Sequence, residues 1–157
     1  MPSKTSSTPL AYEAVTQGIR VRVVPHYLAD QSDPAESRWV WAYAVEIHNE
    51  GDVAVQLRDR HWEITDANGA VQVVDGAGVV GKQPILKPGE SFEYTSGCPL
   101  PTPSGFMVGH YSMVQVAVTQ EVTRTAKVQV ARHMQPFDVA IPAFSLDLPS
   151  AGRKRLH

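Results

Sequence analysis

Three glycines at fixed spacing form the pattern in this 157-residue chain that is most suggestive of chemistry. Gly76, Gly78 and Gly81 spell GxGxxG, which in dinucleotide-binding folds turns a strand into a helix whose amides hold a pyrophosphate. Here Pro84 and Pro88 follow, and proline lacks an amide donor and disfavours helical backbone in the residue before it. At most one helical turn fits after Gly81, so the sequence excludes a nucleotide fold of this type.

A glycine loop in a β protein has a second way to bind phosphate, through a nest of successive backbone amides that needs no helix. The nearest cations in the sequence are Arg58, Arg60 and Lys82, and alternation along a strand predicts that both arginines share one face. With the three glycines they define a candidate site for pyrophosphate or a dinucleoside polyphosphate. The alternative is a purely structural role, because glycine permits tight turns and close approach of strands. Isolated glycine patterns of this kind favour the structural role.

The other residue types that carry chemistry do not form a pattern. Cys98 is the single cysteine, which excludes an intrachain disulfide, and no motif places a histidine beside it as a base. The six histidines include no pair at the spacing of a zinc site, and Asp30, Asp33 and Glu36 lack the pattern of a calcium loop. We therefore expect no catalytic residue, no metal and no cofactor.

Composition limits the partners and the compartment. A formal net charge of −2 gives no basic field for a phosphate backbone, so we expect no nucleic acid. The aromatic run Trp39, Trp41 and Tyr43 fits a core stripe and has no interleaved basic residues. No apolar N-terminal segment predicts a signal peptide or membrane span, and the cysteine usage favours the cytoplasm. Residues 1–10 are expected to be a disordered lead-in, and residues 149–157 a solvated tail.

Alternation of apolar and polar residues predicts short strands between turns. Ile19, Val21 and Val23 alternate with arginines, whereas residues 39–45 are apolar on both faces, as a central strand would be. Residues 97–105 contain three prolines and predict a loop without ladder hydrogen bonds. The strands are expected around residues 19–23, 39–45, 53–57, 62–65, 71–73, 92–94, 107–118 and 139–141. Seven or more antiparallel strands predict one all-β sandwich domain of the immunoglobulin or fibronectin type III kind, over residues 11–148.

The segment between residues 120 and 134 fits two descriptions. Val122, Ala126, Val130 and Met134 have helical spacing, whereas the threonines and the pair Val128 and Val130 favour a strand. We expect a projecting hairpin here, inserted over residues 115–136.

Motifs spread along the chain resemble one family more specifically than the glycine pattern does. They are Arg60-His61-Trp62, Ile64-Thr65-Asp66, the glycine segment 76–81, Gln83-Pro84, Pro88-Gly89, Tyr94-Thr95-Ser96-Gly97, Ser104-Gly105, Gly109-His110-Tyr111, Met113-Val114, Phe137-Asp138 and Ile141-Pro142-Ala143-Phe144. In this order they resemble the bacterial ApaG family from Gly18 to Leu148.

The resemblance implies a fibronectin type III-like sandwich with no established enzymatic activity. Related domains in certain F-box proteins, and in a protein that interacts with DNA polymerase delta, imply a module that binds other proteins. Members have also been linked with cobalt and magnesium resistance, an effect expected to act through a partner. One departure is the segment of about twenty residues between Val114 and Phe137, where family members usually have a short turn. An exposed hairpin there is a candidate arm for a homodimer, or simply a solvated extension.

The sequence thus predicts a noncatalytic, cytoplasmic domain that contacts an unidentified protein, by strand addition or through loops. The alternative is a small-ligand module that binds pyrophosphate-type compounds through the glycine loop. An enzymatic function would need acid, base or metal groups that no short spacing in the chain supplies.

Overall fold

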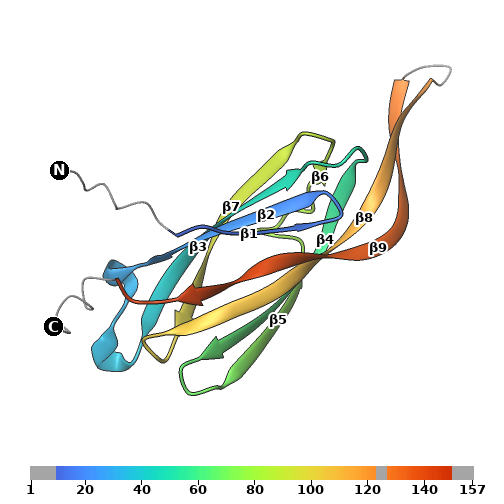
Figure 1. Cartoon of the computed structure of the whole chain (residues 1–157). Helices are drawn as coiled ribbons and strands as arrows, with labels where there is room; N and C mark the ends of the chain where they lie inside the picture. Colours follow the sequence, from blue (N-terminus) through green and yellow to red (C-terminus); the bar gives the residue numbers. More distant parts are fainter. Residues whose placement is uncertain (1–9, 123–126, 150–157) are drawn as a thin grey trace, which may run out of the picture.

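The computed structural model describes residues 10–122 and 127–149 (Figure 1). Nearly all of the predicted lead-in at 1–10 and of the tail at 149–157 lies outside these residues, as does the tip of the predicted hairpin at 123–126. The two helices within them are single 3-10 turns, η2 (Ala29–Gln31) and η3 (Pro34–Glu36). No helix in this part of the chain has the length and apolar character needed to cross a membrane.

The strands form two antiparallel sheets. The first sheet has the order β1, β2, β3, β7, with bounds Tyr12–Thr16, Ile19–Tyr27, Trp39–Asn49 and Ser91–Leu100. The second has the order β5, β4, β8, β9, with bounds Val71–Ala77, Val55–Asp66, Gly105–Val122 and Lys127–Leu146, and a short β6 (Ile85–Leu86) also pairs with β4. The predicted all-β sandwich is confirmed.

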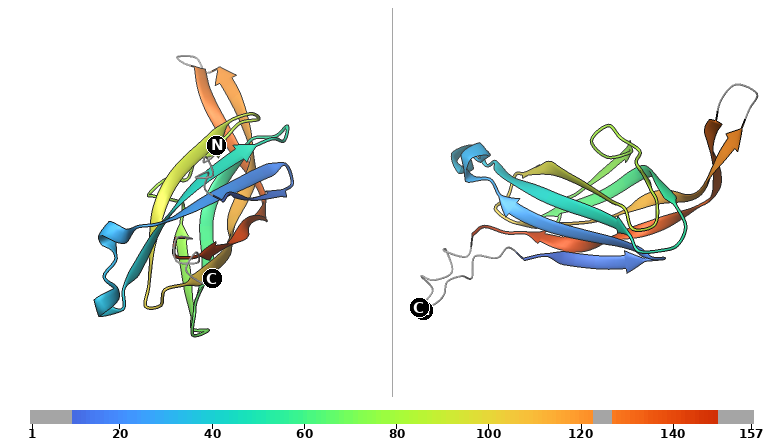
Figure 2. Two further views of the ribbon diagram at one scale, coloured as in Figure 1. Left: turned by 60° about the vertical axis from the view of Figure 1, so that its left-hand side comes forward. Right: turned by 90° about the horizontal axis from the view of Figure 1, so that it is seen from above.

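The core lies between the two sheets, which face each other as layers in Figure 2. Each strand directs alternate side chains inward, so the apolar positions of the sequence pattern meet in the middle. Trp41 from the first sheet and Tyr111 and Phe144 from the second are fully buried. The Phe144 ring contacts Tyr43 and Trp62 with centroids 5.7 and 5.9 Å apart, so aromatic packing joins the layers.

One lateral side of the sandwich is closed by β1 and β9, which lie side by side. The rings of Tyr12 and Phe144 are in contact there, with centroids 6.1 Å apart. The hydroxyl of Thr16 accepts a hydrogen bond of 3.2 Å from the amide of Ala140. The opposite lateral side is bordered by the edge strands β7 and β5, and the glycine segment lies there.

The predicted loop from residue 97 to 105 is wrong in its first part. β7 continues to Leu100, with Gly97, Cys98 and Pro99 opposite β3. Proline is tolerated because β7 is an edge strand of this sheet, so one side of it has no ladder that needs the missing amide. Only residues 101–104 form the loop.

β4 joins two segments that the sequence pattern predicts as separate strands, 53–57 and 62–65. The register against β8 shifts between Leu57 and Asp59, so Arg58 is the extra residue of a β-bulge. A strand that contains a bulge loses its period of two at that point, which is why the pattern indicates two strands.

β8 and β9 are much longer than the predicted strands, with 18 and 20 residues. Their pairing continues from Val116 opposite His133 to Val122 opposite Lys127, so residues 120–122 and 127–134 are strand and not helix. The register shifts between Val114 and Val116, next to the point where β8 stops pairing with β4. Beyond it the two strands project past the sandwich as a hairpin (Figures 1 and 2).

Candidate functional site

The glycine segment forms a tight turn between β5 and β6, beside the bulge of β4. The amide of Gly78 donates to a β4 carbonyl at 2.8 Å, and Val79 and Lys82 exchange amide-to-carbonyl bonds of 2.8 and 2.9 Å. The central residues Val80 and Gly81 have φ values of 43° and 79°, the signs of a type I′ hairpin turn. Three amides of the segment are therefore bonded to backbone carbonyls and are not directed at an anion.

Two of the glycines are explained by close approach of other atoms. Gly78 has a φ of +64°, and a Cβ atom at this position would lie 2.2 Å from the carbonyl oxygen of Lys82. A Cβ atom at Gly76 would lie 2.8 Å from the Cζ atom of Arg60, so the guanidinium lies directly against the Gly76 backbone. The first glycine thus makes room for a cation, and the second closes the turn.

The three predicted cations do not converge. Arg60 is partly buried and lies on the inner side of β4 with Trp62, whereas Arg58 and Lys82 are exposed. The prediction that Arg58 and Arg60 share a face is wrong, because the bulge adds one residue between Leu57 and Asp59 and reverses the alternation.

Arg60 is held by the backbone of the same turn. Its Nη1 atom donates to the carbonyl oxygens of Ala77 at 3.1 Å and Gly78 at 2.8 Å. The register pairs Arg60 with Gly76, so the cation and the first glycine are direct cross-strand neighbours. Only this cation of the predicted set is positioned by the glycine segment.

A cavity of about 300 Å³ opens beside Arg60, between the two sheets. It is lined by Tyr43, Arg60, Trp62, Ala77, Val79, Val80, Gly81, Tyr94 and Ser96. We call this cavity the Arg60 pocket. Its volume lies at the lower end of the range for small-molecule sites. Three of the nine lining residues are aromatic and almost fully buried, and Arg60 is the single charged residue among the nine.

Neutral hydroxyl groups of Tyr43, Tyr94 and Ser96 complete the polar lining of the pocket. The hydroxyls of Tyr94 and Tyr111 are bonded at 2.5 Å, and Tyr43 forms a hydrogen bond with Ser96. Burial raises the pKa of Tyr43, Tyr94 and Tyr111, while the nearby charge of Arg60 acts in the opposite direction. All three phenols are therefore protonated at neutral pH.

The sequence does not indicate these tyrosines as site residues. Its pattern places Tyr43 in a core stripe, and the ring does pack on Trp62 with centroids 5.4 Å apart. Tyr94 and Ser96 are two residues apart and therefore share one face of β7, and this spacing is the feature of the sequence that groups them. Their position opposite β4 depends on how the two sheets pack on each other, which the local sequence pattern does not indicate.

Cys98 lies inward on β7 and has no role in the pocket lining. Burial raises the pKa of its thiol to about 11, so the thiol is protonated at neutral pH. A nucleophilic cysteine needs the opposite shift. Cys98 is therefore part of the packed core.

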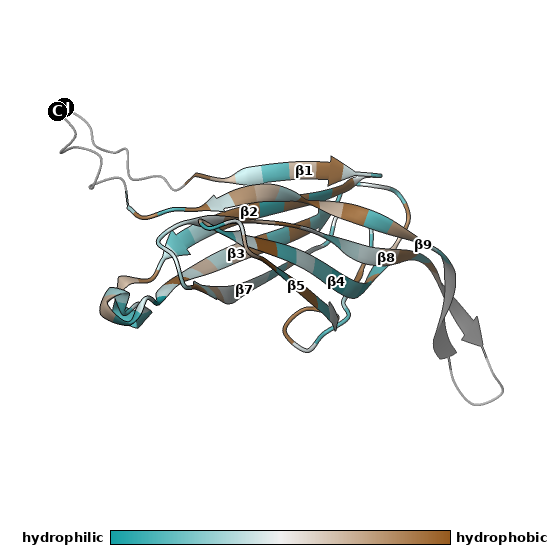
Figure 3. Cartoon of the chain, turned by 90° about the horizontal axis from the view of Figure 1, so that it is seen from below, coloured by the Kyte–Doolittle hydropathy of each residue, from teal (hydrophilic) through white to brown (hydrophobic). Residues whose placement is uncertain are grey.

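The outer face of the second sheet has an apolar patch. Val71 and Val73 of β5 lie across β4 from Phe106 and Val108 of β8, with Thr65 and Glu63 between them. Their exposed fractions are 57%, 56%, 46% and 36%. We call these four side chains the outer patch. Figure 3 shows the apolar segments of β5 in brown.

A histidine pair lies next to the outer patch. His61 of β4 and His110 of β8 are cross-strand partners, and their rings stack with centroids 5.0 Å apart. His61 contacts Asp75 at 2.6 Å and Glu63 at 3.2 Å, while His110 lies 3.9 Å from Asp138. The bonds to Asp75 and Glu63 raise the pKa of His61. Within residues 10–122 and 127–149, no three histidine, cysteine or acidic side chains are placed to hold a metal ion.

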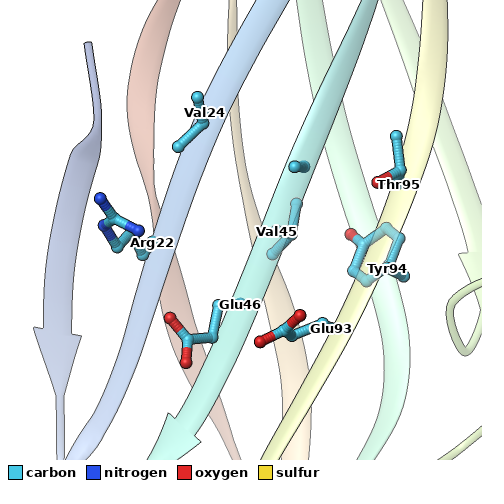
Figure 4. Close-up of a pocket in the computed structure, with 8 residues that line it drawn as sticks. Arg22, Val24, Val45, Glu46, Glu93, Tyr94 and Thr95 are labelled. Atoms are coloured by element: carbon cyan, nitrogen blue, oxygen red, sulfur yellow. The ribbon is translucent and has the colours of Figure 1, made fainter. Parts of the chain in front are cut away.

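A second hollow, of about 380 Å³, lies on the first sheet. Figure 4 shows Arg22, Glu46 and Glu93 side by side on β2, β3 and β7. Glu46 and Glu93 are register partners, and Arg22 already contacts Glu13 at 3.7 Å. The hollow is lined by charged and small side chains and by Tyr94, which also lines the Arg60 pocket.

Comparisons with known proteins agree on one family. Residues 29–115 match the domain family described as the ApaG domain. Protein ApaG of Rhodospirillum centenum is 58% identical over 92% of this chain and 98% of its own length, and Protein ApaG of Mesorhizobium japonicum is 52% identical over 90% and 97%. A crystal structure described as an ApaA protein from Bordetella pertussis superposes with a TM-score of 0.69 at 44% identity, over 90% of this chain and 98% of that one. The chain therefore belongs to the ApaG family.

Proposed function

We propose that this ApaG-family domain is a noncatalytic cytoplasmic module that binds another protein, and that the partner adds an extended segment alongside β5. The observation that carries the proposal is an apolar patch that continues onto a strand with an unpaired edge. The outer patch supplies side-chain contacts, and the edge of β5 supplies backbone hydrogen bonds. The single buried thiol suits a reducing compartment.

The edge of β5 has little of the usual protection against strand addition, with Asp75 as its one charged residue. β5 is the terminal strand of its sheet as far as the structure describes it, and its sequence, VQVVDGA, contains no proline or lysine. Natural sheets commonly protect such edges with these residues or with a bulge. A weakly protected edge with two exposed valines is consistent with a surface that is covered in a complex.

The charges near the outer patch indicate the partner's chemistry. Asp59, Glu63 and Asp75 are exposed on β4 and β5 around the patch. A partner segment with apolar residues at alternate positions, flanked by lysine or arginine, would complement both the valines and these carboxylates. We therefore propose a basic, apolar β-strand as the bound segment.

Replacement of one valine tests this proposal. Val73→Lys places a charge in the outer patch and on the edge strand, so we expect loss of the partner in quantitative affinity capture from cell extract. Val15→Lys is the matched control, because Val15 lies on another edge strand, β1, with an exposed fraction of 58%. Both variants should retain the wild-type circular dichroism. Capture of the same proteins by all three forms would contradict the proposed surface.

A second candidate function is binding of pyrophosphate or a dinucleoside polyphosphate at the glycine segment. The observation in its favour is the contact of the Arg60 guanidinium with the Gly78 carbonyl at 2.8 Å, which brings a cation to the turn. Calorimetric titration with pyrophosphate and diadenosine tetraphosphate tests it, with Arg60→Met as the variant. Gly78→Val is unsuitable here because a Cβ at Gly78 would collide with the turn itself. Absence of heat at millimolar ligand would exclude this function.

The hairpin of β8 and β9 provides a third testable contact, with a second copy of the chain. Its strands extend past the sandwich and are not covered there by β4. Light scattering after size exclusion should give a dimer for the full chain and a monomer after residues 120–134 are shortened. An unchanged mass would exclude the arm.

A further inference from the structure

Arg60 is a partly buried cation without a carboxylate partner. Arg20 and Arg22 contact Glu50 at 2.9 Å and Glu13 at 3.7 Å, whereas Arg60 forms no salt bridge within the described part of the chain. A charge that is partly removed from water without a counter-ion costs free energy, which a counter-ion would offset. The position of Arg60 beside a cavity suggests that the counter-ion comes from a ligand.

The guanidinium still has donors for such a ligand. Among the described residues, both hydrogen bonds of Arg60 leave from Nη1 and go to the carbonyls of Ala77 and Gly78. The Nη2 and Nε atoms form the fork that matches the two oxygens of a carboxylate. Because the two carbonyl bonds fix the plane of the guanidinium, this fork is positioned before a ligand arrives.

We propose that the Arg60 pocket binds a small molecule with one carboxylate, which pairs with the Arg60 guanidinium. This small-molecule site is separate from the outer patch and goes beyond the proposed protein-binding function.

The charge of the pocket selects a monoanion. Arg60 is its single cation, and Tyr43, Tyr94 and Ser96 supply neutral hydroxyls. Pyrophosphate carries several negative charges at neutral pH, and each uncompensated charge would be desolvated at a large cost in free energy. The amides of Gly78, Val79 and Lys82, which could have compensated them, are bonded within the turn or to β4.

The size of the pocket limits the ligand. The rings of Trp62, Tyr43 and Tyr94 are almost fully buried, with exposed fractions of 2%, 5% and 9%, so the apolar surface open to a ligand comes mainly from Val80, which is 55% exposed. A cavity of about 300 Å³ limits the ligand to a small acid.

Nuclear magnetic resonance titration of the full chain tests the proposal, with phenylacetate as the probe and neutral phenylacetamide as its matched control. We expect saturable shifts in the Trp62 indole and in the amides of residues 76–82 with phenylacetate only. Arg60→Met should weaken binding by about ten-fold or more, the effect of losing a charge-assisted hydrogen bond. Arg58→Met and Lys82→Met, which remove exposed cations of the same region, should leave the affinity unchanged.

Gly76→Ala is a second variant that keeps the fold. The three atoms nearest to the added methyl group would all belong to the end of the flexible Arg60 side chain, which must then move. We expect weaker phenylacetate binding with little change in the thermal transition. Val73→Lys should leave phenylacetate binding unchanged, which separates this site from the protein-binding surface.

Three results would overturn the proposal. They are equal shifts with phenylacetate and phenylacetamide, unchanged affinity in Arg60→Met, and binding of pyrophosphate that depends on Arg58 and Lys82. Peptides that end in phenylalanine, with a free or an amidated C-terminus, test the other source of a carboxylate. Binding of the free-acid peptide without binding of phenylacetate would overturn the small-molecule assignment.

Discussion

The two lateral sides of this sandwich end in different ways. On one side β1 and β9 lie together, and Tyr12 packs on Phe144 while Thr16 accepts a hydrogen bond from the β9 backbone. On the other side, the glycine turn and the Arg60 pocket lie between the edge strands β7 and β5. We refer to these as the closed side and the open side.

The difference between the two sides shows where a β-sandwich can form a binding site. When two edge strands meet, their side chains fill the space and satisfy one another's polar groups. On the open side a turn enters instead, and its glycines leave room for Arg60 at Gly76 and for the turn's own carbonyl at Gly78. The unpaired edge of β5 lies on the same side. Both proposed binding surfaces therefore follow from one architectural feature.

Loss of aromatic packing next to the closed side should have the largest effect on stability. Phe144→Ala removes a fully buried ring that contacts Tyr12, Tyr43 and Trp62. We expect the free energy of unfolding to fall by about 3–5 kcal/mol in denaturant titration. A loss typical of an exposed position would show that Phe144 does not join the two layers.

Substitution within the open-side turn should have the next largest effect. Gly78→Val forces a branched side chain into left-handed backbone, which alone costs roughly 1–3 kcal/mol, and adds a collision with the Lys82 carbonyl. Gly81→Val is the matched control, because Gly81 also has a positive φ of +79° but a Cβ atom there would meet no atom of the described residues within 4 Å. Equal destabilisation of the two variants in denaturant titration would contradict the described turn.

The buried hydroxyls and the thiol predict alkaline destabilisation. Folding raises the pKa of Tyr43, Tyr94 and Tyr111 above 10.0 and that of Cys98 from 9.0 to about 11. The unfolded chain therefore loses these protons at lower pH than the folded chain does. Stability should be constant below these ordinary values and decline as the pH rises above 9.0.

Denaturant titration across this alkaline range measures the decline. Cys98→Ala removes one of the four groups, so the decline should become shallower in that variant. A free energy of unfolding that does not change up to pH 11, the folded value for Cys98, would contradict the burial of these groups.

The smallest expected effect concerns the partly exposed histidine pair. The carboxylates of Asp75 and Glu63 raise the pKa of His61 above 6.5 in the folded chain, so the charged imidazole stabilises the fold below pH 6.5. That contribution is lost as the pH rises through the folded pKa. The melting temperature of His61→Asn should therefore fall below that of wild type at acidic pH and approach it at alkaline pH.

His26→Asn provides the control for this measurement, since His26 is an exposed histidine on β2. A pH dependence of His61→Asn equal to that of His26→Asn would show that the carboxylate contacts have no effect on stability.

The local pattern of the sequence predicts most of the strands, because alternation is a property of neighbouring residues. Ile19, Val21 and Val23 are all buried on β2, and the turn at residues 66–69 joins β4 to β5 as expected. The prediction fails where structure depends on distant residues. Pro99 is accommodated because β7 is an edge strand, and edge position is not a local property.

The candidate site is predicted only in part for the same reason. The sequence identifies the glycines and Arg60, but one bulge residue, Arg58, separates the two arginines onto different faces. The Arg60 pocket also needs β3 and β7, whose contribution depends on how the two sheets pair. The stacking of His61 on His110 requires the register of β4 against β8, which no spacing in the sequence reveals.

The most direct test of the central claim, that binding occurs on the open side, is amide hydrogen exchange of the domain with and without its captured protein partner. We predict slower exchange in residues 71–77, at the β5 amides that do not bond to β4, and unchanged exchange in residues 12–16 of β1. Protection confined to β1 or to the β8–β9 hairpin, with β5 unchanged, would contradict it.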